Sequence, residues 1–302
     1  MTHDLREELA TLTTEATDTS LDDIDLVSTL EAARRMNAAD RGVPVALEPC
    51  LPAVAEAADR IADAFAAGGR LVYVGAGTAG RLGILDASEC PPTFGTDPGM
   101  VVGVIAGGTP AITTAVEGAE DDESAAVRDL DALDLTSRDV VVGISASGRT
   151  PYVLSALREA RRRSAASVAV TNNAGSAAGQ IADIAIDVVT GPEFIAGSTR
   201  LKAGTAQKLV LNMLTTLAML RRHKTFGNRM VDVRATNAKL AARSFSLVQE
   251  VTGASEADVG AALHDASGEV KTAIAALLTG LSAASARDRL DAADGSLRAV
   301  LS

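Results

Sequence analysis

Between residues 70 and 190 the chain alternates short, continuously apolar runs with longer segments of helical spacing. The apolar runs are rich in Val and Ile, as strands buried on both faces of a parallel sheet are. They predict strands at residues 71–74, 101–105, 139–144, 167–171 and 183–189. Helical patterns separate or follow them, near residues 79–89, 110–118, 151–164, 174–181 and 200–222. This alternation predicts an α/β fold with a parallel five-stranded sheet covered by helices.

Helical patterns also flank this region. Apolar positions recur at helical spacing late in residues 1–40 and again in residues 52–67. Beyond residue 250, glycines separate short apolar segments, as in a small helical module. We therefore expect an N-terminal segment and helix in 1–51, a sheet domain in 52–225, a linking helix in 226–249 and a small helical module in 250–302.

Composition narrows the function classes. The net charge of −11 disfavours binding to nucleic acid or to an anionic membrane surface. The longest apolar run, residues 209–220, is too short to span a bilayer, and the charged start does not resemble a signal peptide. Two cysteines and three scattered histidines form no metal-ligand spacing. We expect a cytoplasmic protein without a metal site.

A glycine-rich loop follows the first predicted strand. Gly75, Gly77 and Gly80 form G-x-G-x-x-G, a spacing found in dinucleotide sites. Such sites also need an acidic residue after the second strand, and here that strand ends in Ala106-Gly107-Gly108. An NAD-dependent oxidoreductase is therefore disfavoured, and we expect no cofactor. Two interpretations remain, an anion bound at the helix N-terminus by Gly77 and Thr78, or simply a tight turn.

A second loop follows the third predicted strand and carries Ser145, Ser147, Arg149 and Thr150 before Pro151. Proline suits the first turn of a helix. Hydroxyl groups and N–H groups at a helix start can hold a phosphate without a metal. Ordinary helix capping would explain one hydroxyl but not three together with an arginine. This loop predicts a phosphate-binding site.

The two loops resemble those of the sugar isomerase (SIS) domain, a flavodoxin-like fold that binds phosphosugars. More specifically, the chain resembles the N-acetylmuramic acid 6-phosphate etherase family over about residues 20–300. The motifs that carry the resemblance lie at residues 77–83, 86–93, 115–121, 146–152, 197–208 and 228–240. It implies that 52–225 is the SIS domain and that the tail is a UBA-like module. The chain departs from the family at Ala79, where serine is usual, and at Thr14-Glu15-Ala16-Thr17-Asp18, where Thr-Glu-Gly-Arg-Asn is common.

The resemblance implies a lyase that cleaves the D-lactyl ether of N-acetylmuramic acid 6-phosphate during cell-wall sugar recycling. Lactate is eliminated and water is added, which gives N-acetylglucosamine 6-phosphate and D-lactate. The family's two catalytic carboxylates map to Glu89, as proton donor to lactate, and to Glu120, as the better candidate for the C2 base. Because Glu89 precedes Cys90-Pro91-Pro92, we expect it at a helix end near the carboxyl edge of the sheet. Glu120 lies in an acidic run that, without the family, indicates a solvated face.

An acidic protein needs local positive charge to bind such a substrate. The candidates are Arg81, Arg149, Arg200 and Lys202, with Ser198 as a further donor. The resemblance also implies a homodimer. A non-catalytic phosphosugar-sensing regulator of the SIS family is the main alternative, and the presence of both Glu89 and Glu120 favours the enzyme. A DNA-binding sugar-phosphate regulator would need a basic helix-turn-helix, but residues 1–40 are acidic.

Overall fold

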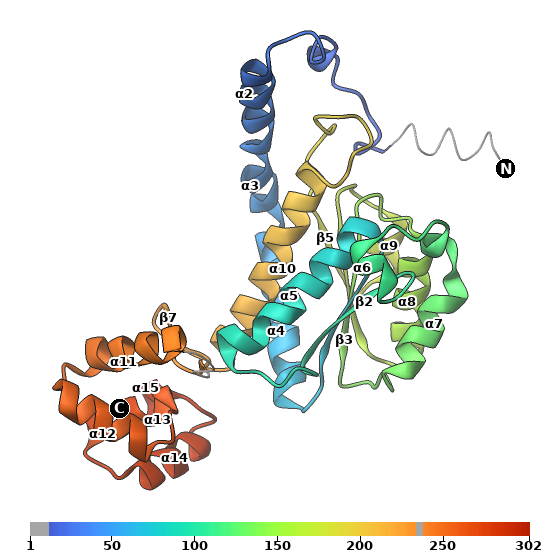
Figure 1. Cartoon of the computed structure of the whole chain (residues 1–302). Coiled ribbons are helices and arrows are strands. Elements are labelled where there is room, and N and C mark those ends of the chain that lie inside the picture. Colours follow the sequence, from blue (N-terminus) through green and yellow to red (C-terminus); the bar gives the residue numbers. More distant parts are fainter. Residues whose placement is uncertain (1–11, 234–237) are drawn as a thin grey trace. The chain divides into compact units, whose positions relative to one another are not determined.

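The computed structural model describes residues 12–233 and 238–302, and its centre is a five-stranded parallel sheet (Figure 1). The strands are β1 (Leu71–Gly75), β2 (Val101–Ile105), β3 (Val140–Ser145), β4 (Ala166–Thr171) and β5 (Ile184–Asp187), in the order β2-β1-β3-β4-β5. The predicted α/β fold is thus confirmed. The last strand is shorter than predicted, and the third extends to Ser145.

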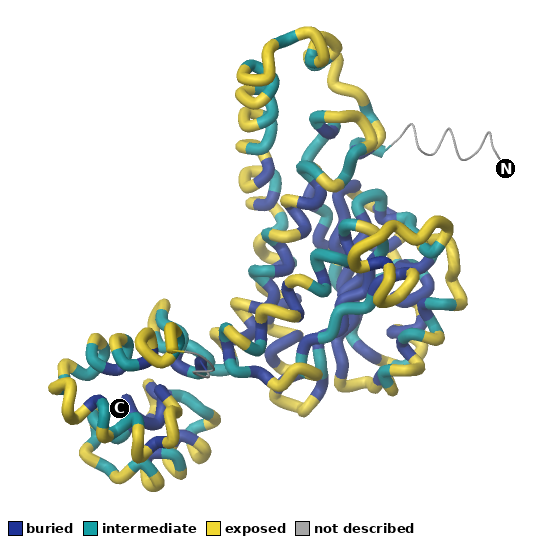
Figure 2. Tube along the Cα trace, in the orientation of Figure 1, coloured by how far each residue is buried: buried dark blue, intermediate teal, exposed yellow. Residues whose placement is uncertain are grey.

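Helices cover both faces of the sheet. On one face lie α4 (Leu51–Ala66), α5 (Gly77–Phe94) and α10 (Lys202–Arg221), and on the other lie α7 (Glu123–Ala132), α8 (Pro151–Arg162) and α9 (Ala177–Ile181). Val72 and Val74 of β1 belong to the apolar cluster that contains Tyr152 of α8, while Tyr73 between them contacts α5. Successive strand residues point to opposite faces, so both faces must be apolar. Figure 2 shows the strands as the most continuously buried part of this unit.

The segment before α4 is largely exposed. It contains the short η1 (Thr19–Leu21), α2 (Thr29–Asp40), α3 (Gly42–Leu47) and η2 (Glu48–Cys50), and α2 has no buried residue. Ser28 caps α2 by accepting a hydrogen bond from the Glu31 amide, as expected for this residue type. Residues 1–11 of the predicted N-terminal segment lie outside the described residues.

One helix boundary was predicted wrongly. The double proline was expected to end α5 near Glu89, but the helix continues through Pro91 and Pro92 to Phe94. Each proline lacks only one helical hydrogen bond, and both lie in the last turns, where few further bonds depend on them. The helix instead ends at Gly95, whose φ is +63° and whose amide donates to the Pro91 carbonyl at 3.0 Å.

The chain divides into two compact units, the first comprising residues up to Ser88 and Gly99–Thr215, the second Glu89–Pro98 and Thr216–Ser302. The second unit contains the hairpin β6 (Thr225–Phe226) and β7 (Arg229–Met230), then α11 (Ala238–Thr252) and four short helices. These are α12 (Glu256–Asp265), α13 (Val270–Thr279), α14 (Ala283–Ala292) and α15 (Leu297–Leu301). Val248, Ile274 and Leu290 belong to their common apolar cluster. The predicted domain boundaries stay a prediction.

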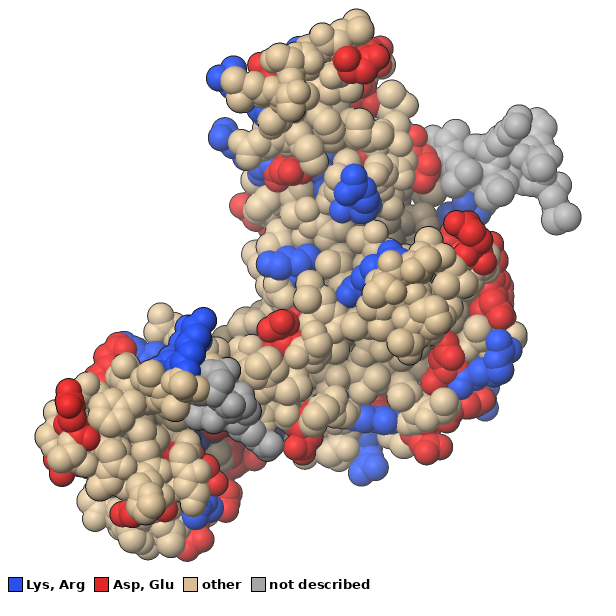
Figure 3. Space-filling view, in the orientation of Figure 1, with Lys and Arg blue, Asp and Glu red and all other residues tan. Residues whose placement is uncertain are grey.

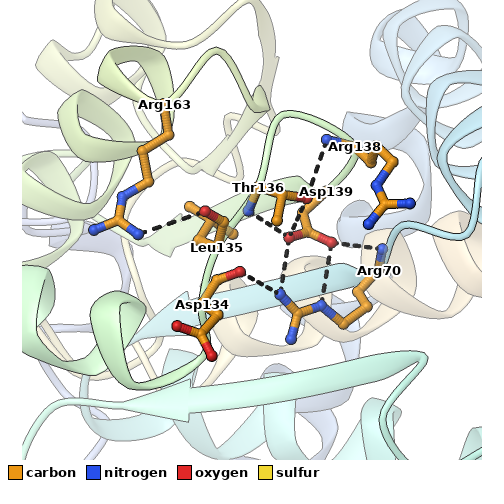
Figure 4. Close-up of polar contacts among 7 residues, drawn as sticks. All are labelled: Arg70, Asp134, Leu135, Thr136, Arg138, Asp139 and Arg163. Carbon is orange, nitrogen blue, oxygen red and sulfur yellow. Dashed lines mark hydrogen bonds and ion pairs between the residues drawn. The ribbon is translucent and has the colours of Figure 1, made fainter.

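An ion pair joins the amino ends of two neighbouring strands (Figure 4). Arg70 precedes β1 and Asp139 precedes β3, and the guanidinium donates to both carboxylate oxygens, at 3.1 and 2.9 Å. The amides of Arg70 and Thr136 also donate to this carboxylate, each at 2.8 Å. Asp139 is 2% exposed. This buried, fully bonded carboxylate fixes β1 against β3 at the sheet edge opposite the strands' carboxyl ends.

Candidate active site

A cavity of 280 Å³ lies at the carboxyl ends of β1 and β3, the two strands between which the chain's winding direction reverses. Ligands of open parallel sheets bind at this position. Except for Ile144, the lining residues are polar or small, and they come from six segments of the first unit: Glu15, Ala76, Gly77, Thr78, Ala79, Glu120, Ile144, Ser145, Ala146, Ser147, Thr150, Gly197, Thr199 and Gln207. The two loops predicted from the sequence are therefore brought together.

The glycines of the first loop have two different roles. A Cβ at Gly75 would lie 2.6 Å from the Gly80 nitrogen, and a Cβ at Gly80 would lie 2.6 Å from the Ile105 side chain. These two glycines therefore let α5 pack closely on β1 and β2. Gly77 has a φ of +53° and open space around its Cβ position, and it lines the cavity with Thr78. The tight-turn interpretation thus holds for Gly75 and Gly80, while anion binding by Gly77 and Thr78 stays a prediction.

The second loop forms a cluster of three hydroxyl groups. Ser145 Oγ lies 2.8 Å from Thr150 Oγ1 and 3.5 Å from Ser147 Oγ. Ser145 Oγ also accepts the Gly148 amide, and Ser147 Oγ accepts the Arg149 amide. Thr150 stands at the N-cap of α8 without a side-chain capping bond. Its hydroxyl therefore belongs to the cluster, and it does not cap the first N–H groups of α8.

Of the two predicted catalytic carboxylates, only Glu120 lines the cavity. It lies in η3 (Ala119–Asp121), after Gly118 with a φ of +71°, and it is exposed. Glu89 is also exposed, but it lies on α5 twelve residues after Gly77, which corresponds to roughly 18 Å along the helix axis. The expectation that Glu89 stands near the carboxyl edge of the sheet was therefore wrong, because α5 starts at that edge and runs away from it.

The predicted cationic residues are not among the lining residues. Arg81 Nε donates to the Ile112 carbonyl at 2.9 Å, and Lys202 Nζ donates to the Thr190 carbonyl at 2.9 Å. Arg149 is half-buried, Arg200 is exposed, and Ser198 lies between two lining residues, Gly197 and Thr199. On the face shown in Figure 3, basic and acidic side chains are interspersed. The cavity's donors are thus mainly hydroxyl and backbone groups.

The loop before α10 is held by a residue that the sequence did not single out. Glu193 is 1% exposed, and its carboxylate accepts the amides of Lys202 and Ala203 at 2.8 and 2.9 Å. A carboxylate at a helix N-terminus is stabilised by the helix dipole. Together with the Lys202–Thr190 bond, it closes the loop that carries Gly197 and Thr199 into the cavity.

Two further lining residues were missed, Glu15 and Gln207. Gln207 lies within a motif that carries the family resemblance, which was the available signal. Glu15 follows Thr14 in the early element, where the chain departs from the family pattern. Nothing in local periodicity connects either residue to the loops after β1 and β3.

Comparison with known proteins decides the family. Residues 53–161 match the model of the glucokinase regulatory protein N-terminal SIS domain, and residues 115–217 match that of the SIS domain. N-acetylmuramic acid 6-phosphate etherase of Streptomyces avermitilis is 57% identical over 98% of this chain and 96% of its own. The etherase of Streptomyces coelicolor is 55% identical over 99% of this chain and 96% of its own length. That of Aliivibrio salmonicida is 51% identical over 98% of this chain and 99% of its own length.

The chain belongs to the N-acetylmuramic acid 6-phosphate etherase family. Among solved structures, a phosphoheptose isomerase from Francisella tularensis aligns with 67% of this chain and 100% of its own, at 23% identity and a TM-score of 0.49. No helix in the described ranges combines the length and apolar character that a membrane crossing requires. Within this etherase family, the cavity at β1 and β3 is the candidate site for a small phosphosugar.

Proposed function

We propose that this protein is a carbon–oxygen lyase that cleaves the D-lactyl ether of N-acetylmuramic acid 6-phosphate. The observation that carries the proposal is the cavity itself, in which a three-hydroxyl loop and two helix starts face an exposed carboxylate, Glu120, in a chain of the etherase family. The products are N-acetylglucosamine 6-phosphate and D-lactate. We place the protein in the cytoplasm, in cell-wall sugar recycling.

The hydroxyl cluster suits the phosphate. Ser145, Ser147 and Thr150 offer O–H donors at the start of α8. At the start of α5, Gly77 offers a backbone N–H and Thr78 an O–H. Two helix N-termini favour a dianion without a metal. Arg81, Arg149, Ser198, Arg200 and Lys202 stay proposed as substrate-binding residues that stand around the cavity rather than in its wall.

The elimination step needs two proton transfers. Opening of the sugar ring exposes an aldehyde that makes the C2 proton acidic. A base removes that proton, the C3–oxygen bond breaks as lactate takes up a proton, and water then adds at C3. We assign the base to Glu120, because it lines the cavity, and the proton donor to Glu89. A positioned acid or base contributes about a hundred- to ten-thousandfold.

The position of Glu89 is relevant to whether the chain forms a homodimer. Because it lies outside the cavity lining of its own chain, we propose a homodimer in which Glu89 of one chain serves the site of the other. Glu89→Gln and Glu120→Gln chains refolded together would test this. A dimer that contains one chain of each variant would then have one intact site of its two. Because about half of the dimers in a statistical mixture are of this kind, the mixture should recover roughly a quarter of wild-type activity. If the mixture is no more active than the separate variants, then either both carboxylates of a site come from the same chain, or one of them takes no part in the reaction.

The decisive experiment is turnover in ¹⁸O-enriched water. The protein is incubated with N-acetylmuramic acid 6-phosphate, and D-lactate release and the position of the label are measured. We expect the label on C3 of the sugar, and label in lactate would contradict the elimination route. Phosphosugar binding without lactate release would favour the alternative, a non-catalytic phosphosugar sensor.

A further inference from the structure

Hydrogen bonds to Asn172 and Asn173, most of them to the Asn173 side chain, hold the N-terminal segment beside the cavity. Asn173 accepts the Thr13 amide at 2.7 Å and the Thr13 hydroxyl at 2.9 Å through its side-chain oxygen. Its side-chain nitrogen donates to the Thr14 hydroxyl and to the Ala146 carbonyl, each at 3.0 Å. Asn173 is 4% exposed and Thr14 is fully buried. One buried amide therefore holds the segment against the hydroxyl loop, to which Ala146 belongs.

This attachment brings the next side chain into the cavity wall. Glu15 follows Thr14 directly and lines the cavity together with Gly197. Its Oε2 lies 3.5 Å from the position that a Cβ on Gly197 would occupy. Because Gly197 has a φ of +74° and no side chain, the carboxylate faces an open stretch of the loop before α10.

The wall thus has two kinds of hydrogen-bonding group. The hydroxyl cluster and the helix starts are donors and suit the phosphate, whereas a carboxylate repels a phosphate and accepts hydrogen bonds from neutral donors. A phosphosugar carries such donors on its ring, as hydroxyl groups and, for an N-acetylamino sugar, an amide N–H. Glu120 is assigned to the acid–base chemistry, and Glu15 is a second carboxylate in the same wall.

We propose that Glu15 is a sugar-binding residue that accepts hydrogen bonds from ring hydroxyl or amide N–H groups, and that Asn173 is the positioning residue that holds it there. This inference rests on the proposed function, since it takes the cavity as the phosphosugar site. Glu15 then distinguishes a phosphosugar from a simple phosphate, and Asn173 acts only through Glu15 and the hydroxyl loop.

The test compares two ligands, N-acetylglucosamine 6-phosphate and inorganic phosphate, by titration calorimetry. Hydrogen bonds to a charged group are strong, so Glu15→Ala should weaken phosphosugar binding by about ten- to hundredfold. Phosphate binding should stay unchanged or become tighter, because a negative charge leaves the cavity. Asp25→Asn removes an exposed carboxylate of the same segment outside the cavity lining and should change neither.

Positioning by Asn173 is tested through Thr14. Thr14→Val keeps the shape and removes the hydroxyl, while the Asn173–Ala146 bond remains. It should weaken phosphosugar binding and leave phosphate binding unchanged. The double variant Thr14→Val, Glu15→Ala should bind the phosphosugar no more weakly than Glu15→Ala alone. Additive losses would mean that Thr14 does not act through Glu15.

Two results would overturn the assignment of Glu15: equal loss of both ligands in Glu15→Ala, or no loss of either. These readouts use binding alone. If the wild-type protein binds the phosphosugar but releases no lactate from N-acetylmuramic acid 6-phosphate, the proposed function fails. The assignment of Glu15 is then still judged by comparing its effect on phosphosugar affinity with its effect on phosphate affinity. A wild-type protein that does not bind the phosphosugar overturns the assignment as well.

Discussion

The side-chain amide of Asn212 donates to the carboxylate of Asp86 at 2.7 Å, which joins α10 to α5. The same carboxylate accepts the hydroxyls of Tyr73 at 2.9 Å and Thr215 at 3.3 Å. Asp86 is 6% exposed. Since α5 starts at the cavity and α10 carries Gln207, this buried carboxylate sets the spacing of two elements that build the site.

We expect Asp86→Asn to destabilise the protein. The NH2 group of the asparagine would replace one carboxylate oxygen and face at least one of the three donors. A buried unsatisfied donor costs on the order of 2 kcal/mol. Burial raises the pKa of Asp86 above its ordinary 3.8, although the three hydrogen bonds lower it. The folded state therefore binds the proton more tightly than the unfolded state, and the wild type loses part of its stability as the pH rises from about 4 through the raised pKa. Urea unfolding across pH measures this, and the variant should lack that decline. Parallel pH profiles for both proteins would contradict it.

Asp139 should show the opposite pH dependence. Burial opposes ionisation, but Arg70 and the Thr136 amide outweigh it and lower the pKa of Asp139 below 3.8. Its stabilisation is therefore present above pH 3.8 and is lost as the pH falls toward the lowered pKa. Asp139→Asn should cost on the order of 3 kcal/mol at pH 7, and the cost should shrink below pH 4.

The matched control for Asp139 is Asp134→Asn. Asp134 contacts Arg70 through its backbone carbonyl, at 3.3 Å, rather than through its carboxylate (Figure 4). Thermal and urea unfolding should leave this variant close to the wild type at every pH. An equal loss in both variants would mean that the general acidity of this region, not the ion pair, is responsible.

Ala79→Ser should strengthen phosphate binding. Ala79 lines the cavity and is 7% exposed, at the position where the family usually carries serine. A hydroxyl there would add a donor beside Thr78, worth roughly tenfold in affinity for an anion. Inhibition of lactate release by inorganic phosphate measures the change. An unchanged or weaker inhibition constant would show that the added hydroxyl does not reach the anion.

Thr150→Val should weaken binding of the substrate's phosphate. The substitution keeps the shape of the side chain, but it removes the hydroxyl that lies 2.8 Å from Ser145 Oγ and leaves the donors at the start of α8 in place. We expect KM for the phosphosugar to rise about tenfold, with a smaller change in kcat. A fall in kcat alone would place Thr150 in the chemical step rather than in phosphate binding.

Glu120→Gln should lower kcat by about a hundred- to ten-thousandfold and leave binding of N-acetylglucosamine 6-phosphate nearly intact, since glutamine keeps the size but cannot take a proton. Glu117→Gln is the control, because Glu117 belongs to the same acidic run but does not line the cavity. Exchange of the C2 proton with ²H₂O, followed by NMR, separates loss of the base from loss of lactate departure. Retained exchange in Glu120→Gln would assign the base elsewhere.

Much of the fold followed from short-range pattern. Short continuous Val and Ile runs predicted the strands because β-branched residues suit a sheet that is buried on both faces. The hydroxyls at residues 145, 147 and 150 were likewise visible as donors at the start of a helix. The end of α5 was not predictable in this way. A proline usually ends or kinks a helix, but α5 continues through Pro91 and Pro92, and local pattern does not show which turn is last.

The sequence by itself therefore determined the strands, the parallel sheet, the two loops that line the cavity and, through long motifs, the family. Only the tertiary structure decided which residues meet. β1 and β3 are neighbours in the sheet although β2 lies between them in the chain, and this places both loops in one cavity. Thr14 meets Asn173 across 159 residues, which brings in Glu15, while the rigid length of α5 carries Glu89 away. Such contacts depend on strand order and helix length, which no local pattern of side chains encodes.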